Sequence, residues 1–87
     1  MAELVFSKQF EQSIKSLPPK VQEKMAGRLE ILRVDPFDSR LHTKHLAGKL
    51  QERLSFRITR AWRVIFEFIK PDTIHVLKIT QRKDAYR

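Results

Sequence analysis

The spacing of apolar residues changes period once along this chain, and that change limits the folds available to it. Between residues 10 and 32, apolar side chains recur every three or four positions, as they do on one face of an α-helix. Between residues 54 and 80 they alternate with polar residues or follow one another in β-branched runs, which is typical of strands. The sequence therefore predicts an α+β domain with its helices in the first half and most of its strands in the second.

Prolines divide the first half into two predicted helices. Leu4–Phe6 predicts a brief strand, and Ser7 after it is a typical helix N-cap. The first helical stripe ends at Pro18, because the residue before a proline is disfavoured in helical conformation, and the second ends before Pro36 for the same reason. The two stripes consist of Phe10, Ile14 and Leu17, and of Val21, Met25, Leu29 and Leu32. We therefore expect a helical hairpin.

Three strands are predicted in the second half, at Leu54–Ile58, Trp62–Ile69 and Ile74–Thr80. Pro71 and Asp72 favour a type I turn between the last two. Residues 36–48 show no period and predict a loop, and the polar residues 81–87 predict a tail or a short turn. The expected fold is one α+β domain over residues 1–87: a short strand, a helical hairpin and a three-stranded antiparallel meander (βααβββ), with the helices packed on one face of the sheet.

The positive charge of the chain is concentrated in its second half. The net charge is +8, of which residues 1–43 carry +1 (seven Lys and Arg against six Asp and Glu) and residues 44–87 carry +7 (eleven against four). Such a field attracts polyanions, and nucleic acid is the partner class that we expect. The chain has no cysteine, which excludes disulfides and thiolate metal sites, and no apolar run of about 20 residues. We expect a cytoplasmic protein without a membrane partner, a metal or another cofactor.

Several basic residues are expected on the sheet face that the helices leave uncovered. If Leu54, Phe56 and Ile58 face the helices, strand alternation puts Arg53 and Arg57 on the other side. The same alternation in the next strand adds Arg63. Arginine suits phosphate recognition because its planar fork donates two hydrogen bonds and keeps its charge. The flanking segments contribute further basic residues: Lys44 and Lys49 before the strands, and Arg82, Lys83 and Arg87 after them.

Four segments of the second half form an ordered set of motifs: Leu46-Ala47-Gly48-Lys49-Leu50, Ser55-Phe56-Arg57-Ile58, Trp62-Arg63-Val64-Ile65-Phe66 and Arg82-Lys83-Asp84-Ala85-Tyr86-Arg87. Together they resemble the RelE/ParE superfamily of bacterial toxin–antitoxin toxins. That family has an L-x-G-x-L step before a strand that ends in arginine, then an aromatic-R-aliphatic-aliphatic-aromatic strand, and a basic-aromatic tail. The resemblance covers the second half of the chain.

The resemblance implies a toxin of a type II toxin–antitoxin module that inhibits growth until an acidic, RelB-like antitoxin binds it in a hetero-oligomer. RelE-like members are endoribonucleases (mRNA interferases) that cut mRNA on the ribosome, whereas ParE-like members inhibit DNA gyrase and are not nucleases. RelE-like lysines are absent from the strand around Ser55, and the histidine that some branches carry in the tail is absent near Gln81. Both activities therefore stay open.

The implied sites follow from the matched positions. Cleavage without a metal needs positive charge on the phosphoryl oxygens, a base for the 2′-hydroxyl and an acid for the leaving oxygen. The resemblance implies catalytic roles for Arg57, Arg63, Arg82 and Tyr86, with Arg63 matching the arginine of the family's central strand. Lys44, Lys49 and His45 are the candidate bases. Nucleic-acid contacts are expected from Lys44, His45, Lys49, Arg53, Arg60, Lys83 and Arg87.

Overall fold

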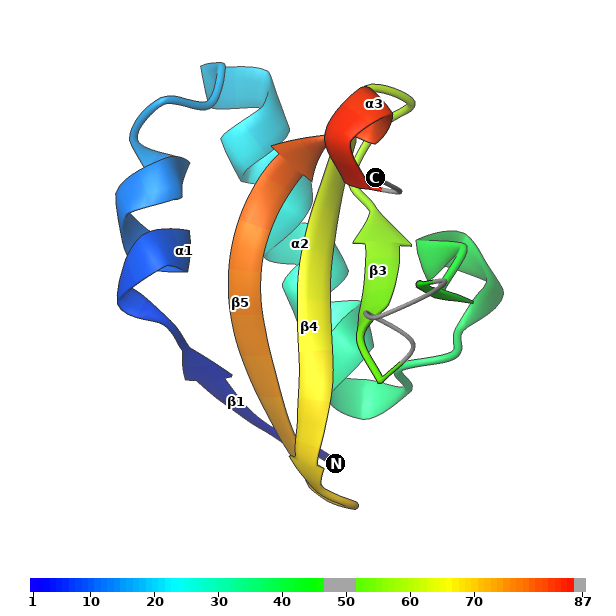
Figure 1. Cartoon of the computed structure of the whole chain (residues 1–87). Coiled ribbons are helices and arrows are strands. Elements are labelled where there is room, and N and C mark those ends of the chain that lie inside the picture. Colours follow the sequence, from blue (N-terminus) through cyan, green and yellow to red (C-terminus); the bar gives the residue numbers. More distant parts are fainter. Residues whose placement is uncertain (47–51, 86–87) are drawn as a thin grey trace.

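The computed structural model describes residues 1–46 and 52–85 of the 87-residue chain, and in these residues a five-stranded sheet lies against the long helix α2 (Figure 1). The α+β architecture and the βααβββ order expected from the sequence are confirmed, with additions described below. In chain order the elements are β1 (Glu3–Phe6), α1 (Lys8–Ile14), α2 (Pro19–Val34), the 3₁₀ helix η1 (Ser39–Leu41), β2 (Lys44–His45), β3 (Leu54–Arg57), β4 (Trp62–Lys70), β5 (Thr73–Gln81) and α3 (Arg82–Ala85).

The sheet is mixed, with strand order β1-β5-β4-β3-β2. β3, β4 and β5 form the predicted antiparallel meander. β1 joins it beside β5 in parallel, with Leu4 opposite Ile74, because the intervening helices carry the chain across one face before the meander begins. The turn between β4 and β5 is tight, with Lys70 paired to Thr73 across Pro71 and Asp72.

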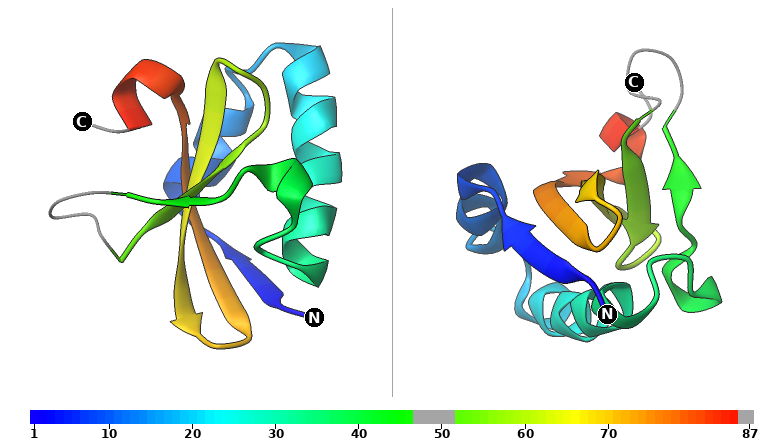
Figure 2. Two further views of the ribbon diagram at one scale, coloured as in Figure 1. Left: turned by 90° about the vertical axis from the view of Figure 1, so that its right-hand side faces the viewer. Right: turned by 90° about the horizontal axis from the view of Figure 1, so that it is seen from below.

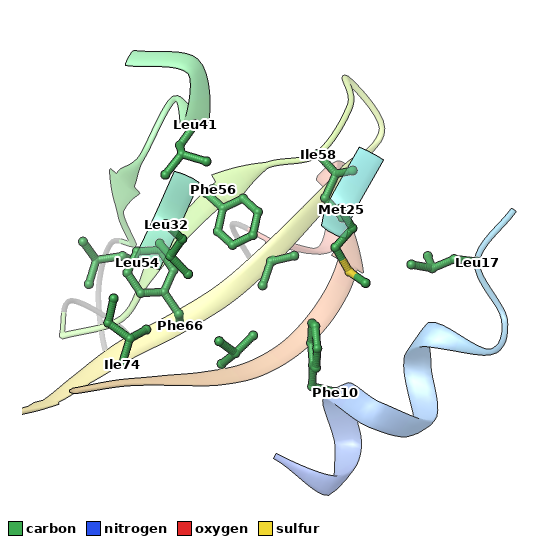
Figure 3. Packing of buried hydrophobic residues seen from close by; sticks show 12 residues of the cluster. Phe10, Leu17, Met25, Leu32, Leu41, Leu54, Phe56, Ile58, Phe66 and Ile74 are labelled. Atoms are coloured by element: carbon green, nitrogen blue, oxygen red, sulfur yellow. The ribbon is translucent and has the colours of Figure 1, made fainter. Parts of the chain in front are cut away.

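Helix α2 lies along one face of the sheet and does not extend over the other face (Figure 2). The apolar face of β3 and β4 packs against α2, as Figure 3 shows for Phe56 and Phe66, whose ring centroids are 6.1 Å apart. The buried cluster comprises Phe10, Leu17, Met25, Leu32, Leu41, Leu54, Phe56, Ile58, Val64, Phe66, Ile74 and Val76. The opposite side of β3 and β4 is also largely buried: Ser55, Arg63 and Ile65 lie there, and Ile65 forms a second apolar cluster with Leu46 and Leu77.

Helices α1 and α2 begin where the sequence predicts. The Ser7 hydroxyl accepts a hydrogen bond from the Phe10 backbone N–H at 3.0 Å, which caps α1, and donates one to the Leu77 carbonyl of β5. Pro19 occupies the first turn of α2, where a missing N–H costs nothing. No helix in the described part of the chain is long and apolar enough to cross a membrane.

Two segments that were predicted to be irregular contain structure. The predicted loop at residues 36–48 holds η1 and the two-residue strand β2, which pairs antiparallel with β3. Neither is visible as a hydrophobic period, because each is too short to show one. The predicted tail begins with α3 instead, and the Arg82 N–H donates to the Ala61 carbonyl at 2.7 Å, which anchors the start of that helix.

Gly27 is a position where the chain can gain stability. It lies exposed within α2, and a Cβ added there would meet no atom within 4 Å. We expect Gly27→Ala to raise the free energy of unfolding by about 0.5–1 kcal/mol, because alanine loses less backbone entropy in a helix. Urea unfolding measures this, and Ala26→Gly, at the exposed neighbouring position, is the matched control with an expected loss of similar size. A Gly27→Ala protein that is less stable than the wild type would contradict the placement.

Asp38 gives the stability of the chain a dependence on pH. Its side chain accepts hydrogen bonds from the Arg40 side chain and from the Arg40 backbone N–H, and these bonds lower the pKa of Asp38 from 3.8 to about 2. A folded-state pKa below the unfolded one adds stability above about pH 4, and that contribution is lost as the pH falls from 4 toward 2. We expect the gap in melting temperature between wild type and Arg40→Met to narrow over this interval. A difference in melting temperature that stays constant from pH 7 to pH 2 would show that the bonds from Arg40 do not lower the pKa of Asp38.

Candidate nucleic-acid interface

The face of the sheet away from α2 carries a row of basic side chains, which range from buried (Arg63) to exposed (Lys44). Arg57 on β3 lies directly opposite Arg63 on β4, and the two therefore share a face. On the next strand, Lys78 lies opposite Ile65 and so projects to the same side. On the edge strand β2, Lys44 pairs with Ser55 and extends the row. Four strands thus contribute one basic residue each, which we call the basic row: Lys44, Arg57, Arg63 and Lys78.

Lys78 is the member of the basic row that sequence reasoning missed. β5 has apolar residues on both faces, so its single lysine gave no alternation to follow. A register shift between β4 and β5 puts Ile65 opposite Lys78 and Phe66 opposite Val76, which leaves Leu77 without a pairing residue. Such a bulge re-aims the side chains after it. The signal that could have found Lys78 is its position as the one charged residue in an otherwise apolar strand.

Arg57 has unused hydrogen-bonding capacity. Its side chain is half-buried, and its Nε is buried and has no hydrogen-bond partner among the described residues. Arg57 pairs directly with Arg63 across the two strands, but the Arg63 guanidinium is bound to backbone carbonyls of the β3–β4 turn. A buried donor without a partner favours an anion at this point.

Arg63 lies on the predicted face, but the expectation that it is exposed there is wrong. Only 4% of the residue is exposed. Its Nη1 donates hydrogen bonds to the backbone carbonyls of Thr59, Arg60 (2.9 Å) and Trp62 (3.2 Å). The side chain therefore folds back onto the β3–β4 turn. Strand alternation predicts which face a residue occupies, but not that its guanidinium will find carbonyl acceptors three and four residues earlier. The catalytic role of Arg63 stays a prediction.

A basic pocket lies at the end of the sheet, between the β3–β4 turn and the start of α3. It has a volume of about 560 Å³ and is lined by Arg60 and Ala61 on one side and by Gln81, Arg82 and Lys83 on the other. The hydrogen bond from the Arg82 N–H to the Ala61 carbonyl joins the two sides. Arg60, Arg82 and Lys83 are all exposed. The structure thus brings these three predicted residues together in one site.

The remaining predicted residues divide into three groups. His45 pairs with Leu54, whose side chain enters the core, so His45 lies on the opposite side of the sheet from the basic row. Arg53 is half-buried beside β3, and its carbonyl accepts the Leu46 N–H. Lys49, Tyr86 and Arg87 lie outside the described residues.

One acidic side chain on β4 lies near the basic row. Glu67 contacts His75 on β5, with 3.7 Å between the Glu67 Oε1 and the His75 Nδ1. Glu67 is four residues (about 13 Å along a strand) beyond Arg63 but only two residues beyond Ile65, which lies opposite Lys78. Within the described part of the chain, neither Arg57 nor Arg63 is paired with a carboxylate. Guanidinium and ammonium groups in such a row suit the phosphates of a nucleic acid.

Comparison with solved structures identifies the architecture. The whole chain aligns with YafQ from E. coli over 100% of both chains, with a TM-score of 0.79 and 11% sequence identity. A YoeB/ParE toxin from Agrobacterium tumefaciens aligns with 92% of this chain and 98% of its own, with a TM-score of 0.77 and 17% identity. This chain has the fold of the RelE/ParE toxins. The toxin of an archaeal RelE–RelB complex from Pyrococcus horikoshii aligns equally well, with a TM-score of 0.77, 23% identity, and coverage of 97% of this chain and 98% of that one.

The likeness to the RelE/ParE toxins is one of fold. No family model matches the sequence, and no curated protein does. The structural matches extend over the helical hairpin as well as the meander, whereas the sequence motifs cover only the second half of the chain. The structure therefore extends the resemblance to the first half of the chain, where the sequence motifs give none.

Proposed function

We propose that this protein is the toxin of a type II toxin–antitoxin module and acts as an mRNA interferase that cleaves mRNA on the ribosome. The observation that carries the proposal is the basic row on the sheet face away from α2, in which the buried Arg57 Nε lacks a partner among the described residues, together with the basic pocket at the end of the sheet. The RelE/ParE toxin fold supports the same conclusion.

The proposed chemistry is metal-independent attack by the 2′-hydroxyl of RNA on the adjacent phosphate. The 2′-oxygen forms a bond to phosphorus and the bond to the 5′-oxygen breaks, which leaves a 2′,3′-cyclic phosphate and a 5′-hydroxyl. In this proposal Arg57 and Arg82 hold the phosphoryl oxygens, whose charge grows in the transition state. Tyr86 gives a proton to the leaving oxygen. His45 lies on the other side of the sheet, so Lys44 and Lys49 are the candidate bases that remain, and Lys44 shares the described face with Arg57.

The proposed regulator is an acidic antitoxin. The +7 charge of residues 44–87 favours rapid association with an acidic partner segment, and like charges would reject a basic one. Apolar side chains are exposed beside the helical hairpin: Phe6 is 40% exposed and stacks on Phe10 with 5.3 Å between ring centroids. An amphipathic antitoxin helix fits such a surface. The Pyrococcus horikoshii protein above was solved as a complex of RelE with RelB, which supports this part of the proposal.

Inhibition of DNA gyrase without nuclease activity is the second candidate function. One observation favours it: Arg63, the arginine that matches the family's central strand, is buried and bonded to backbone carbonyls. A guanidinium committed in this way offers less to a scissile phosphate. The basic row would then serve to bind a partner and not to cleave RNA.

The two functions are separated by two assays on one purified sample. In the first, the protein is incubated with ribosomes translating a defined mRNA, and the RNA fragments are sized. In the second, it is incubated with gyrase and relaxed plasmid, and supercoiling is followed. We expect RNA fragments and undisturbed supercoiling. Intact mRNA together with loss of supercoiling would overturn the interferase proposal in favour of the gyrase one.

A further inference from the structure

We infer that the pocket between the Thr59–Trp62 turn and the start of α3 holds a single nucleotide of the bound strand, with Arg60 as its phosphate contact. That the strand is RNA rests on the proposed function; the inference adds a binding position beside the basic row. It assigns Arg60 a direct role in ligand binding, and it assigns Arg63 the role of holding the turn that presents Arg60.

The size and lining of the pocket fit a nucleotide. Its volume of about 560 Å³ lies within the roughly 300–1,000 Å³ typical of small-ligand sites. Ala61 and the aliphatic stems of Arg60, Arg82 and Lys83 offer apolar surface to a base or sugar. The charged ends of the same three side chains suit a phosphate.

The basic side chains of the pocket are available to a ligand. Ion pairs between described residues join Glu30 to Arg33, Asp38 to Arg40 and Glu67 to His75, and these leave Arg60, Arg82 and Lys83 out. In the described part of the chain their positive charges are therefore not neutralised by a carboxylate at contact distance. An anionic ligand would therefore not have to displace a carboxylate of the described residues from these side chains.

The turn that carries Arg60 is held by a dense set of hydrogen bonds. Thr59 Oγ1 accepts from the backbone N–H groups of Ala61 (3.2 Å) and Trp62 (3.3 Å), and the Trp62 carbonyl accepts from Ile58 N–H at 3.0 Å. The Arg63 guanidinium adds its bonds to the carbonyls of the same turn, including that of Arg60 itself. The backbone of Arg60 is thus fixed before a ligand arrives, which lowers the entropy lost on binding.

Binding in the pocket is best followed from the ligand. The single tryptophan, Trp62, packs against the core and is not part of the pocket lining. A fluorescent dye on the RNA reports binding directly.

The test is a titration of a dye-labelled, four-nucleotide single-stranded RNA with the full chain, followed by fluorescence anisotropy at several salt concentrations. We expect Arg60→Ala to weaken binding roughly tenfold, because a charge-assisted bond to phosphate is lost. The slope of log affinity against log salt should fall by about 0.7, the value for one phosphate contact on a single strand. Lys24→Ala, which removes an exposed positive charge from α2, is the matched control and should leave both quantities near wild type.

A second measurement locates the ligand. Adenosine 5′-monophosphate, used as the probe with isotope-labelled protein, should shift the backbone amide signals of Arg60, Ala61, Arg82 and Lys83 more than that of Lys44. The inference is overturned if Arg60→Ala binds RNA as the wild type does, or if the shifted signals lie elsewhere. These readouts need no RNA cleavage, so an inactive protein with an intact binding site would overturn the proposed function and leave this inference standing.

Discussion

Arg63→Ala is expected to lower the free energy of unfolding by about 3 kcal/mol. Arg63 is 4% exposed, and its Nη1 donates to the carbonyls of Thr59, Arg60 and Trp62. Hydrogen bonds from a charged donor contribute about 1.5–3 kcal/mol each, and removing the donor leaves carbonyls of the turn unsatisfied. The loss is smaller than the sum of three such bonds, because one Nη1 group, with two hydrogens, is shared among the three carbonyls. Urea unfolding followed by circular dichroism measures the change.

Arg57→Ala is the matched control for that experiment. Arg57 is the same residue type, directly opposite Arg63 on β3, but its Nε has no hydrogen-bond partner among the described residues. Its removal should change the free energy of unfolding by less than about 1 kcal/mol. If Arg63→Ala is as stable as the wild type, or if Arg57→Ala is the more damaging of the two, the assignment of Arg63 as the residue that holds the turn is wrong.

Arg57→Ala is also expected to reduce RNA cleavage by the purified protein about 100-fold while its fold stays intact. Removing one donor that stabilises a developing negative charge typically lowers kcat by about 10²–10³. Arg57 is the member of the basic row with a buried, unpartnered Nε in the described part of the chain, so it has the most to gain from a phosphoryl oxygen. The rate of cleavage of ribosome-bound mRNA by wild-type and variant protein measures the effect.

The control for the cleavage experiment is Lys24→Ala, which removes one positive charge from the exposed side of α2, away from the basic row. Its rate should match that of the wild type. Equal losses for Lys24→Ala and Arg57→Ala would mean that overall charge matters and that the position of Arg57 does not. That outcome would remove the catalytic assignment of Arg57.

The fold was largely predictable because its long elements carry strong periodic patterns. Phe10, Met25 and Leu32 are buried as the helical stripes require, and Phe56 and Phe66 meet in the core as strand alternation requires. Leu17 is also buried, but α1 ends at Ile14, so Leu17 lies beyond the helix that was predicted to carry it. The parallel pairing of Leu4 with Ile74 was not predictable in the same way. This pairing depends on where the chain lies after the helical hairpin, and no local sequence pattern predicts that position.

The candidate site was predictable in its position and less so in its geometry. Alternation correctly places Arg57 and Arg63 on one face, because the side-chain period of a strand is fixed. Whether a guanidinium group extends into solvent or bonds to a backbone carbonyl depends on the turn next to it. The Arg63 guanidinium bonds to the Arg60 carbonyl of that turn. The β4–β5 bulge that brings in Lys78 is a departure from alternation and therefore invisible to it.

The most direct test of the central claim is the mapping of RNA 5′ ends in bacterial cells after the protein is induced without an antitoxin. We predict that growth stops and that new 5′-hydroxyl ends arise within the coding regions of mRNA. Cells that express Arg57→Ala at the same level should show neither. If growth stops while transcripts remain intact, or if growth continues in cells that contain folded wild-type protein, the protein is not the mRNA interferase proposed here.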